Sequence, residues 1–202
     1  MDEWPWCSVG ARRHAVASAD QVATRAGDRI FAVGGNAVDA AIATNAAIAV
    51  TGPHLCGMGG DLFALVYAEG EVHALNSSGR AGSGADADAL RSAGHTTVPL
   101  RHEPQAVTVP GCIDGWIALH DRFGSLPLAE LLTPAIDLAD QGFAASPLLV
   151  DALGLLDDAG RRSLHELVTA ATRSGAPVRR PGVARALRAI AAEGRACLLY
   201  TS

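Results

Sequence analysis

The chain has 202 residues, which is sufficient for one domain or for a large piece of a bigger one. Its net charge of −5 argues against a nucleic-acid partner, because proteins that bind nucleic acids usually present a basic face. Aromatic residues make up only 4% of the chain while 49% is hydrophobic, so we expect a core of small aliphatic side chains in close contact.

The N-terminal part of the chain predicts a strand followed by a helix. Residues 15–19 read Ala-Val-Ala-Ser-Ala, which is typical of a short buried strand. Asp20 is placed to cap a helix over residues 21–33, where apolar side chains recur at helical spacing. The two glycines at 34–35 end this helix, because glycine adopts the left-handed conformation of a C-cap without steric cost.

A second helix follows at once and is apolar nearly all round. Asn36 can cap it, and Asp39 stands three residues later, where the acid of a capping box belongs. Residues 37–50 therefore predict a buried central helix. This run is shorter than the roughly 20 apolar residues that a membrane span needs, so we expect no membrane association. Residues 1–17 lack the apolar stretch of a signal peptide, and we expect a cytoplasmic protein.

The middle of the chain predicts a β-hairpin. A glycine-rich turn at residues 57–60 leads into an apolar run over 62–67. Glu69 and Gly70 form a second turn, and residues 72–75 make the returning strand. The next residues, up to position 88, are rich in Ser, Gly and Asp and predict a loop.

Residues 106–109 predict one more strand, and helices dominate after the Pro-Gly pair at 110–111. The first of these helices carries Ile113, Trp116 and Ile117 on one face. The other predicted helices cover residues 127–142, 147–157 and 181–194. A hairpin followed by helices indicates a mixed α/β (α+β) fold with an antiparallel sheet and a helix-rich C-terminal half.

Nucleotide and metal sites are not predicted. The glycines at 57–60 do not complete the dinucleotide fingerprint, because position 62 is Leu and a strand follows where that motif needs a helix. The histidines are scattered, and His54 with Cys56 is the only close pair, whereas structural zinc usually has four ligands. We expect His54 to be a turn residue and the four cysteines to be free thiols, with no metal and no cofactor.

The residues offer no credible nucleophile, because the chain lacks the GxSxG motif of serine hydrolases and a base near Thr96 or Thr97. Arg80 is the most interesting candidate for binding. It follows the hairpin in a loop of small residues at 76–79, where a guanidinium can grip a carboxylate with two parallel hydrogen bonds. Without further information, a solvated surface charge is the more common role for such an arginine.

Several segments, in the same order, resemble γ-glutamyltranspeptidases over about residues 14–196. These segments are residues 14–18, 23–27, 34–41, 53–54, 57–63, 76–80, 109–111 and 142–143. The run Gly-Gly-Asn-Ala-Val-Asp-Ala-Ala at 34–41 is a specific signal. The Gly-Gly-Asp at 59–61 and the Ser-Gly-Arg-Ala loop around Arg80 resemble the glutathione-hydrolase-like branch of the family.

The resemblance implies an N-terminal-nucleophile hydrolase fold, a four-layer αββα sandwich. In that family a precursor cuts itself, and the new N-terminal Thr of the small subunit is the nucleophile, with its own amine as base. That Thr is expected beyond Ser202, so the resemblance assigns no catalytic residue to this chain. It does assign Arg80 to the α-carboxylate of a γ-glutamyl donor such as glutathione, and it places the glycine turn at 57–60 in the core beneath the site.

We therefore expect residues 1–196 to form one incomplete domain, part of a large subunit that is inactive without its small subunit. Residues 197–202 depart from the family pattern and are expected to be a foreign or out-of-frame tail. The missing partner predicts uncovered apolar surface and poor solubility. Two alternatives remain open: a cephalosporin-acylase-like amidase of the same fold, and a non-catalytic scaffold subunit that binds a small carboxylate through Arg80.

Overall fold

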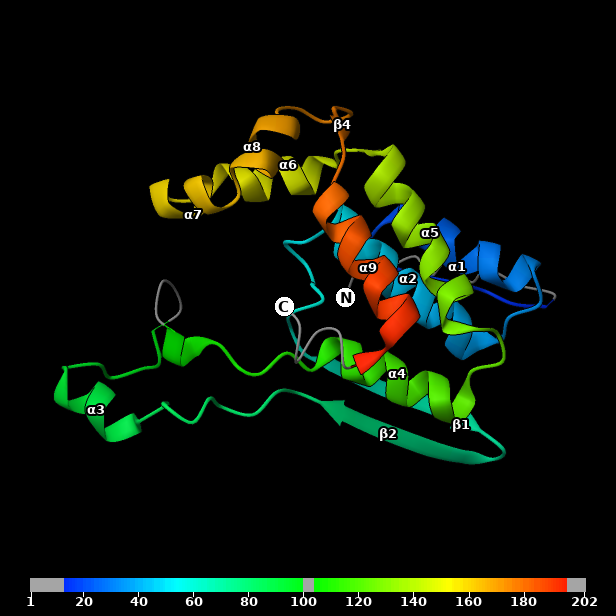
Figure 1. Cartoon of the computed structure of the whole chain (residues 1–202), viewed down its shortest axis with the longest axis horizontal. Coiled ribbons are helices and arrows are strands. Elements are labelled where there is room, and N and C mark those ends of the chain that lie inside the picture. Colours follow the sequence, from blue (N-terminus) through cyan, green and yellow to red (C-terminus); the bar gives the residue numbers. More distant parts are fainter. Residues whose placement is uncertain (1–12, 100–103, 196–202) are drawn as a thin grey trace, which may run out of the picture.

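The computed structural model describes residues 13–99 and 104–195 (Figure 1). The first half contains α1 (Gln21–Ala32), α2 (Ala37–Thr51), β1 (Leu62–Ala68), β2 (Glu71–Ser77), α3 (Ala87–Ser92) and a 3-10 turn, η1 (Pro104–Ala106). The second half contains α4 (Cys112–Phe123), α5 (Leu128–Gln141), β3 (Phe143–Ala144), α6 (Pro147–Gly154), α7 (Asp158–Ser163), α8 (His165–Ala170), β4 (Pro177–Val178) and α9 (Pro181–Glu193). The described chain is thus mostly helical, with two small antiparallel sheets.

Helix α1 begins as predicted from the sequence. The Asp20 carboxylate accepts a hydrogen bond from the Val22 backbone N at 2.6 Å, which satisfies a free donor of the first turn. Its other oxygen accepts from the Thr51 hydroxyl at 2.7 Å, so one side chain joins the start of α1 to the end of α2. The predicted stop is also confirmed, since Gly34 has a φ of +96° and begins the turn between the two helices.

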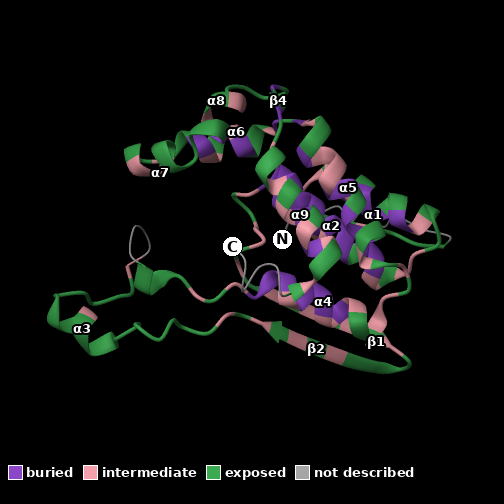
Figure 2. Cartoon of the chain, viewed as in Figure 1, coloured by how far each residue is buried: buried purple, intermediate pink, exposed green. Residues whose placement is uncertain are grey.

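Helix α2 is the centre of the core, in contact with α1, α4 and α5 (Figures 1 and 2). The predicted capping box is present, with Asn36 accepting from the backbone and Asp39 accepting from the Asn36 backbone N. At its other end, the half-buried Arg180 guanidinium donates to the carbonyls of Ala49 and Val50 at 3.1 and 3.0 Å. Burial lowers the pKa of Arg180, yet the carbonyl ends of α2 give its charge suitable acceptors.

Close contact between helices depends on small side chains. A Cβ at Gly27 in α1 would lie 2.2 Å from the Thr44 hydroxyl in α2, so only glycine fits at this crossing. Only two aromatic side chains, Trp116 and Phe143, belong to the buried hydrophobic core of the described residues. The predicted core of small aliphatic residues is therefore confirmed.

The predicted hairpin is present and longer than expected. β1 and β2 pair from Leu62 opposite Ser77 to Ala68 opposite Glu71. The two turn residues, Glu69 and Gly70, both have positive φ, as a two-residue turn that matches the twist of the strands requires. One face of the hairpin packs on α4.

The other face of the hairpin is apolar and uncovered. Phe63, Leu65 and Tyr67 alternate along β1, and their exposed fractions are 67%, 78% and 75%. Since antiparallel sheets usually have a polar face toward water, three large exposed apolar side chains on one strand mark a surface that has no partner among the described residues.

Four helices of the C-terminal half follow the predictions only in part. α4, α5 and α9 lie close to the predicted positions. α5 packs on α2 and also contacts α9. The helix predicted over 147–157 ends at Gly154, and the short helices α7 and α8 follow where no helix was predicted. The small β3–β4 sheet, which was not predicted, returns the chain to α9.

Two predicted strands are wrong for the described chain. Residues 15–19 were predicted to be buried, yet four of the five are exposed. They are extended but belong to no sheet, because no other described strand lies alongside them. Residues 106–109 form only a single bridge, Thr108 opposite Ala81, and Ala106 belongs to the 3-10 turn η1. The predicted boundary at residue 196 and the tail at 197–202 lie outside the described residues.

Candidate functional site

Arg80 lies where a long arm of the chain leaves and rejoins the core. The chain departs from β2, forms the arm that carries α3, and returns to α4 (Figure 1). We call the crossing of the two arm ends, residues 77–81 and 108–111, the neck. The Arg80 side chain is exposed, and it forms no ion pair within residues 13–99 and 104–195.

Hydrogen bonds fix the backbone on both sides of Arg80. The Val109 backbone N donates to the Arg80 carbonyl at 2.9 Å. The Gly79 backbone N donates to the Asp61 carboxylate at 3.2 Å, and the Thr108 hydroxyl reaches the same oxygen at 3.5 Å. The main chain of Arg80 is therefore held in place while its guanidinium stays free to bind.

The neck tolerates no side chain at two of its glycines. A Cβ at Gly79 would lie 1.6 Å from the Val109 carbonyl oxygen, and a Cβ at Gly111 would lie 2.0 Å from the Ser77 carbonyl oxygen. The Ser77 hydroxyl also donates to the Gly111 carbonyl at 2.8 Å. Two segments more than 25 residues apart in sequence thus cross at backbone contact distance, which gives Arg80 a rigid base.

The glycine-rich turn at 57–60 braces the same crossing from the core side. The Gly60 carbonyl accepts from the backbone N of Gly111 at 3.0 Å and from that of Cys112 at 2.8 Å. The Gly60 backbone N in turn donates to Gly57. These bonds connect the start of β1 to the start of α4. His54 lies in the preceding turn, as predicted, but its side chain is exposed and not packed.

Cys56 and Cys112 are free thiols, as predicted. Burial raises the pKa of the Cys112 thiol to about 12, and nearby Cys56 and Asp61 add to the shift. Burial also raises the pKa of Cys56. Because a thiolate is the reactive form, these raised pKa values argue against either thiol as a nucleophile. The other two cysteines, Cys7 and Cys197, lie outside the described residues.

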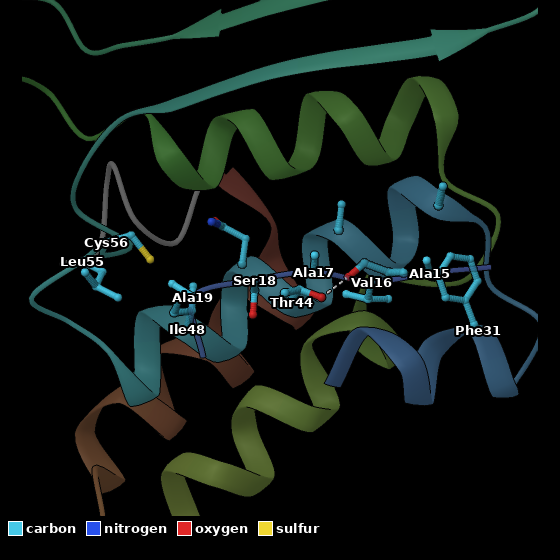
Figure 3. A pocket seen from close by; sticks show the side chains of 14 residues that line it. Ala15, Val16, Ala17, Ser18, Ala19, Phe31, Thr44, Ile48, Leu55 and Cys56 are labelled. Carbon is cyan, nitrogen blue, oxygen red and sulfur yellow. Dashed lines mark hydrogen bonds between the residues drawn. The ribbon is translucent and has the colours of Figure 1, made fainter. Parts of the chain in front are cut away.

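A cavity of about 530 Å³ lies elsewhere, between α2 and the extended segment at 15–19 (Figure 3). Six of its fourteen lining residues are alanine, and Thr44, Asn45 and Cys56 are the polar members of the helix and turn sides. Arg80 does not line it, so the candidate carboxylate site and this cavity are separate features. Within the described ranges, no group of three or more His, Cys, Asp or Glu side chains could hold a metal ion.

No helix in the described part of the chain is long and apolar enough to cross a membrane.

Comparison with known proteins gives one consistent family. The family model of γ-glutamyltranspeptidase matches residues 23–201. The glutathione hydrolase-like YwrD proenzyme of Bacillus subtilis is 42% identical over 141 residues, which cover 69% of this chain and 26% of that protein.

Two further similarities point to the same family. The acylase ACY 1 proenzyme of a Pseudomonas species is 34% identical over 189 residues, covering 86% of this chain and 34% of that protein. The γ-glutamyltranspeptidase of Helicobacter pylori has a similar structure, with a TM-score of 0.84 and 26% identity over 94% of this chain and 57% of that chain. The chain thus spans about a quarter to a third of the length of these curated relatives.

The residues that support Arg80 were not predicted from the sequence. Asp61 and Thr108 are far from Arg80 in sequence, and only the crossing at the neck brings them beside its loop. The one sequence signal for the crossing is a glycine at each arm end, Gly79 and Gly111, neither of which lies in a predicted tight turn. Glycine at such positions indicates close approach of two backbones.

Proposed function

This chain belongs to the γ-glutamyltranspeptidase family, and we propose that it is the N-terminal portion of a precursor that hydrolyses or transfers γ-glutamyl groups. The donor we propose is a γ-glutamyl compound such as glutathione. The observation that carries this proposal is Arg80, an exposed guanidinium on a backbone fixed at the neck. The 42% identity to a glutathione hydrolase-like proenzyme supports the same choice of donor.

In this proposal Arg80 binds the α-carboxylate of the donor. A planar guanidinium can donate two parallel hydrogen bonds to a carboxylate, which fixes the direction of the donor as well as its charge. The bonds from Val109, and from Gly79 to Asp61, reduce the freedom of the loop, so less entropy is lost when the donor binds. The γ-carbonyl of the donor then extends away from Arg80 toward the nucleophile.

The nucleophile in this proposal is the N-terminal Thr of a small subunit beyond this chain. Its amine takes the hydroxyl proton as the oxygen attacks the γ-carbonyl. The C–N bond then breaks, the leaving amine receives the proton, and a γ-glutamyl ester remains on the Thr. Water or an acceptor amine releases the γ-glutamyl group in a second step. The chain described here contributes donor binding, and by itself it is inactive.

We also propose that the complete fold is the four-layer αββα sandwich of N-terminal-nucleophile hydrolases. The hairpin β1–β2 covers α4 on one side and presents Phe63, Leu65 and Tyr67 on the other. In a sandwich, a second sheet packs face to face on such a surface at about 10 Å. The small subunit supplies that sheet, and the isolated chain is poorly soluble because the surface stays exposed.

The test uses a full-length precursor that joins this chain to the C-terminal part that its relatives carry. We expect the matured precursor to hydrolyse γ-glutamyl p-nitroanilide and the 202-residue chain alone to release no nitroaniline. Glutaryl p-nitroanilide, which keeps the carboxylate and lacks the α-amine, should react far more slowly. A matured precursor that leaves the γ-glutamyl anilide intact would overturn the proposal.

A second candidate function is a cephalosporin-acylase-like amidase. The 34% identity to an acylase proenzyme over 86% of the chain favours it as the alternative. Such an enzyme would accept the glutaryl anilide in preference to the γ-glutamyl anilide. The same assay therefore separates the two functions by the order of the two rates.

A further inference from the structure

A second pocket lies on the arm, next to the neck. The chain leaves the neck along the arm and returns beside itself, and Thr108 on the returning end forms a bridge with Ala81 on the outgoing end (Figure 1). Past this bridge, residues 82–85 on the outgoing end and residues 104–105 on the returning end line a pocket of about 330 Å³. The pocket shares no residue with the cavity beside α2.

Hydrogen bonds hold both walls of this pocket in shape. The Ala85 backbone N donates to the Gly82 carbonyl at 2.9 Å, which closes a turn in the outgoing wall. The Val107 backbone N donates to the Pro104 carbonyl at 3.0 Å, in the 3-10 turn of the returning wall. Because the walls are already ordered, a ligand that binds between them fixes little additional chain.

The lining of the pocket is polar and uncharged. Among the described residues that line it, only Ser83 and Gln105 carry a polar side chain, and neither side chain bonds to a residue within 13–99 or 104–195. Gly82 and Gly84 have open space where a side chain would stand. A side-chain amide donates through its NH₂ and accepts through its oxygen, so Gln105 can pair with both groups of a peptide unit. The pocket therefore suits the main chain of a short peptide better than a charged group or an apolar ring.

The position of the pocket relative to Arg80 indicates which peptide it can receive. Gly82 follows Arg80 by two residues, and an extended residue advances the chain by about 3.3 Å, so the pocket begins about 7 Å along the arm. This separation is similar to the length of a γ-glutamyl group. When Arg80 holds the α-carboxylate of a donor, the amide bond at the other end of that group can therefore reach the pocket.

We propose that the pocket at residues 82–85 and 104–105 binds the peptide part of the substrates. It receives the leaving group of a γ-glutamyl peptide and then the acceptor peptide that replaces it. One pocket serves both, because the acceptor amine attacks the same carbonyl carbon that the leaving amine has left. This inference rests on the proposed function, since Arg80 must first place the γ-glutamyl group.

The test compares two donors of the matured precursor. Glutathione has a peptide as its leaving group, whereas the p-nitroaniline of γ-glutamyl p-nitroanilide has no peptide unit for Gln105 to pair with. The double variant Ser83→Ala, Gln105→Ala removes both polar side chains of the pocket. The ratio of kcat/KM for glutathione to kcat/KM for the anilide should fall roughly 5- to 50-fold, as expected for two neutral hydrogen bonds. An unchanged ratio would overturn the inference.

A matched control removes the same two kinds of side chain elsewhere. Ser92 lies on α3 of the same arm and Gln141 lies at the end of α5, and both are exposed and outside the pocket. The double variant Ser92→Ala, Gln141→Ala should keep the natural ratio of the two donors. An equal fall of the ratio in both double variants would contradict the proposed pocket.

A variant that fills the pocket gives a second readout. Gly84→Leu adds a side chain in open space, and the backbone there needs no glycine conformation. The apparent KM for glycylglycine, as acceptor from the anilide donor, should rise at least about fivefold in this variant, because the peptide and the leucine compete for one space. A natural KM for glycylglycine in Gly84→Leu would overturn the acceptor role.

The two donors also separate this inference from the proposed function. A precursor that cleaves the anilide, with the same donor ratio in the natural protein and in Ser83→Ala, Gln105→Ala, would overturn the pocket and leave the function intact. A precursor that cleaves neither γ-glutamyl donor would overturn both.

Discussion

The buried carboxylate of Asp39 holds Ser125 through three hydrogen bonds. The Ser125 backbone N lies 3.1 and 3.2 Å from the two carboxylate oxygens, and its hydroxyl donates to one of them. Asp39 also accepts from the Asn36 backbone N, while the Asn36 amide donates to the Phe123 carbonyl at 2.6 Å. The polar residues of the run at 34–41 therefore fasten the start of α2 to the end of α4, and their role is structural.

Replacing the carboxylate should destabilise the fold. Asp39→Asn puts an amide NH₂ among backbone donors that need acceptors, and Asp39 is fully buried. Hydrogen bonds to a charged group contribute more than neutral ones, so we expect a loss of about 2–3 kcal/mol in the free energy of unfolding. Chemical denaturation of the 202-residue chain measures this loss.

Asp28→Asn is the matched control, because the Asp28 side chain is 68% exposed and, among the residues that the structure describes, pairs only with His14. An exposed pair of this kind contributes little, and we expect a change below about 1 kcal/mol. If both variants unfolded at the same denaturant concentration, the structural role of Asp39 would be wrong.

A second prediction concerns the close backbone contact at the neck. Gly79→Ala brings a Cβ within 1.6 Å of the Val109 carbonyl oxygen, so the two arm ends must separate. We expect a loss of about 1–3 kcal/mol in the chain and a higher KM for the donor in the precursor. Gly82→Ala is the control, since a Cβ there meets no atom within 4 Å. A precursor whose KM is equally unaffected by both changes would show that the neck does not position Arg80.

Alkaline pH should lower stability through Cys112. Its pKa is about 12 in the folded chain against 9.0 as the reference value, so the unfolded state loses this proton first. Between these two pH values the unfolded state binds fewer protons, and stability falls as pH rises. The expected loss is roughly 1 kcal/mol by pH 10.

The chain is well suited to this measurement, because it contains no lysine to titrate in the same range. Thermal melts from pH 8 to 10.5 should show a steeper decline for the natural chain than for Cys112→Ala. Parallel declines in the two proteins would assign the alkaline effect to another group, such as Cys56, whose pKa is also raised by burial.

Local signals in the sequence predicted the elements that are stabilised locally. Asp20 and Asn36 cap helices with their own side chains, and the Glu69-Gly70 turn sets the hairpin register, so neighbours in sequence decide these structures. The strand predicted at 15–19 is wrong for a related reason, because a strand is defined by pairing with a partner in space and no described strand lies beside this segment.

Much of the candidate site also depends on long-range contacts. Arg80 was selected as a candidate carboxylate-binding residue from the small residues of its loop and from the family resemblance. Its role in binding stays a prediction. Its support by Asp61 and Val109 arises from a crossing of segments that no local pattern encodes. Short helices such as α7 and α8 were missed for a related reason, because six residues carry too little periodicity to predict a helix.

The central claim is that Arg80 binds the α-carboxylate of a γ-glutamyl donor. The most direct measurement is kcat/KM of the matured precursor for γ-glutamyl p-nitroanilide and for 4-aminobutyryl p-nitroanilide, which lacks only that carboxylate. The natural enzyme should prefer the first by roughly 10- to 100-fold, as expected for charge-assisted hydrogen bonds. Arg80→Ala should abolish this preference, while the control Arg91→Ala, an exposed arginine of the same arm, keeps it. A full preference in Arg80→Ala would contradict the account.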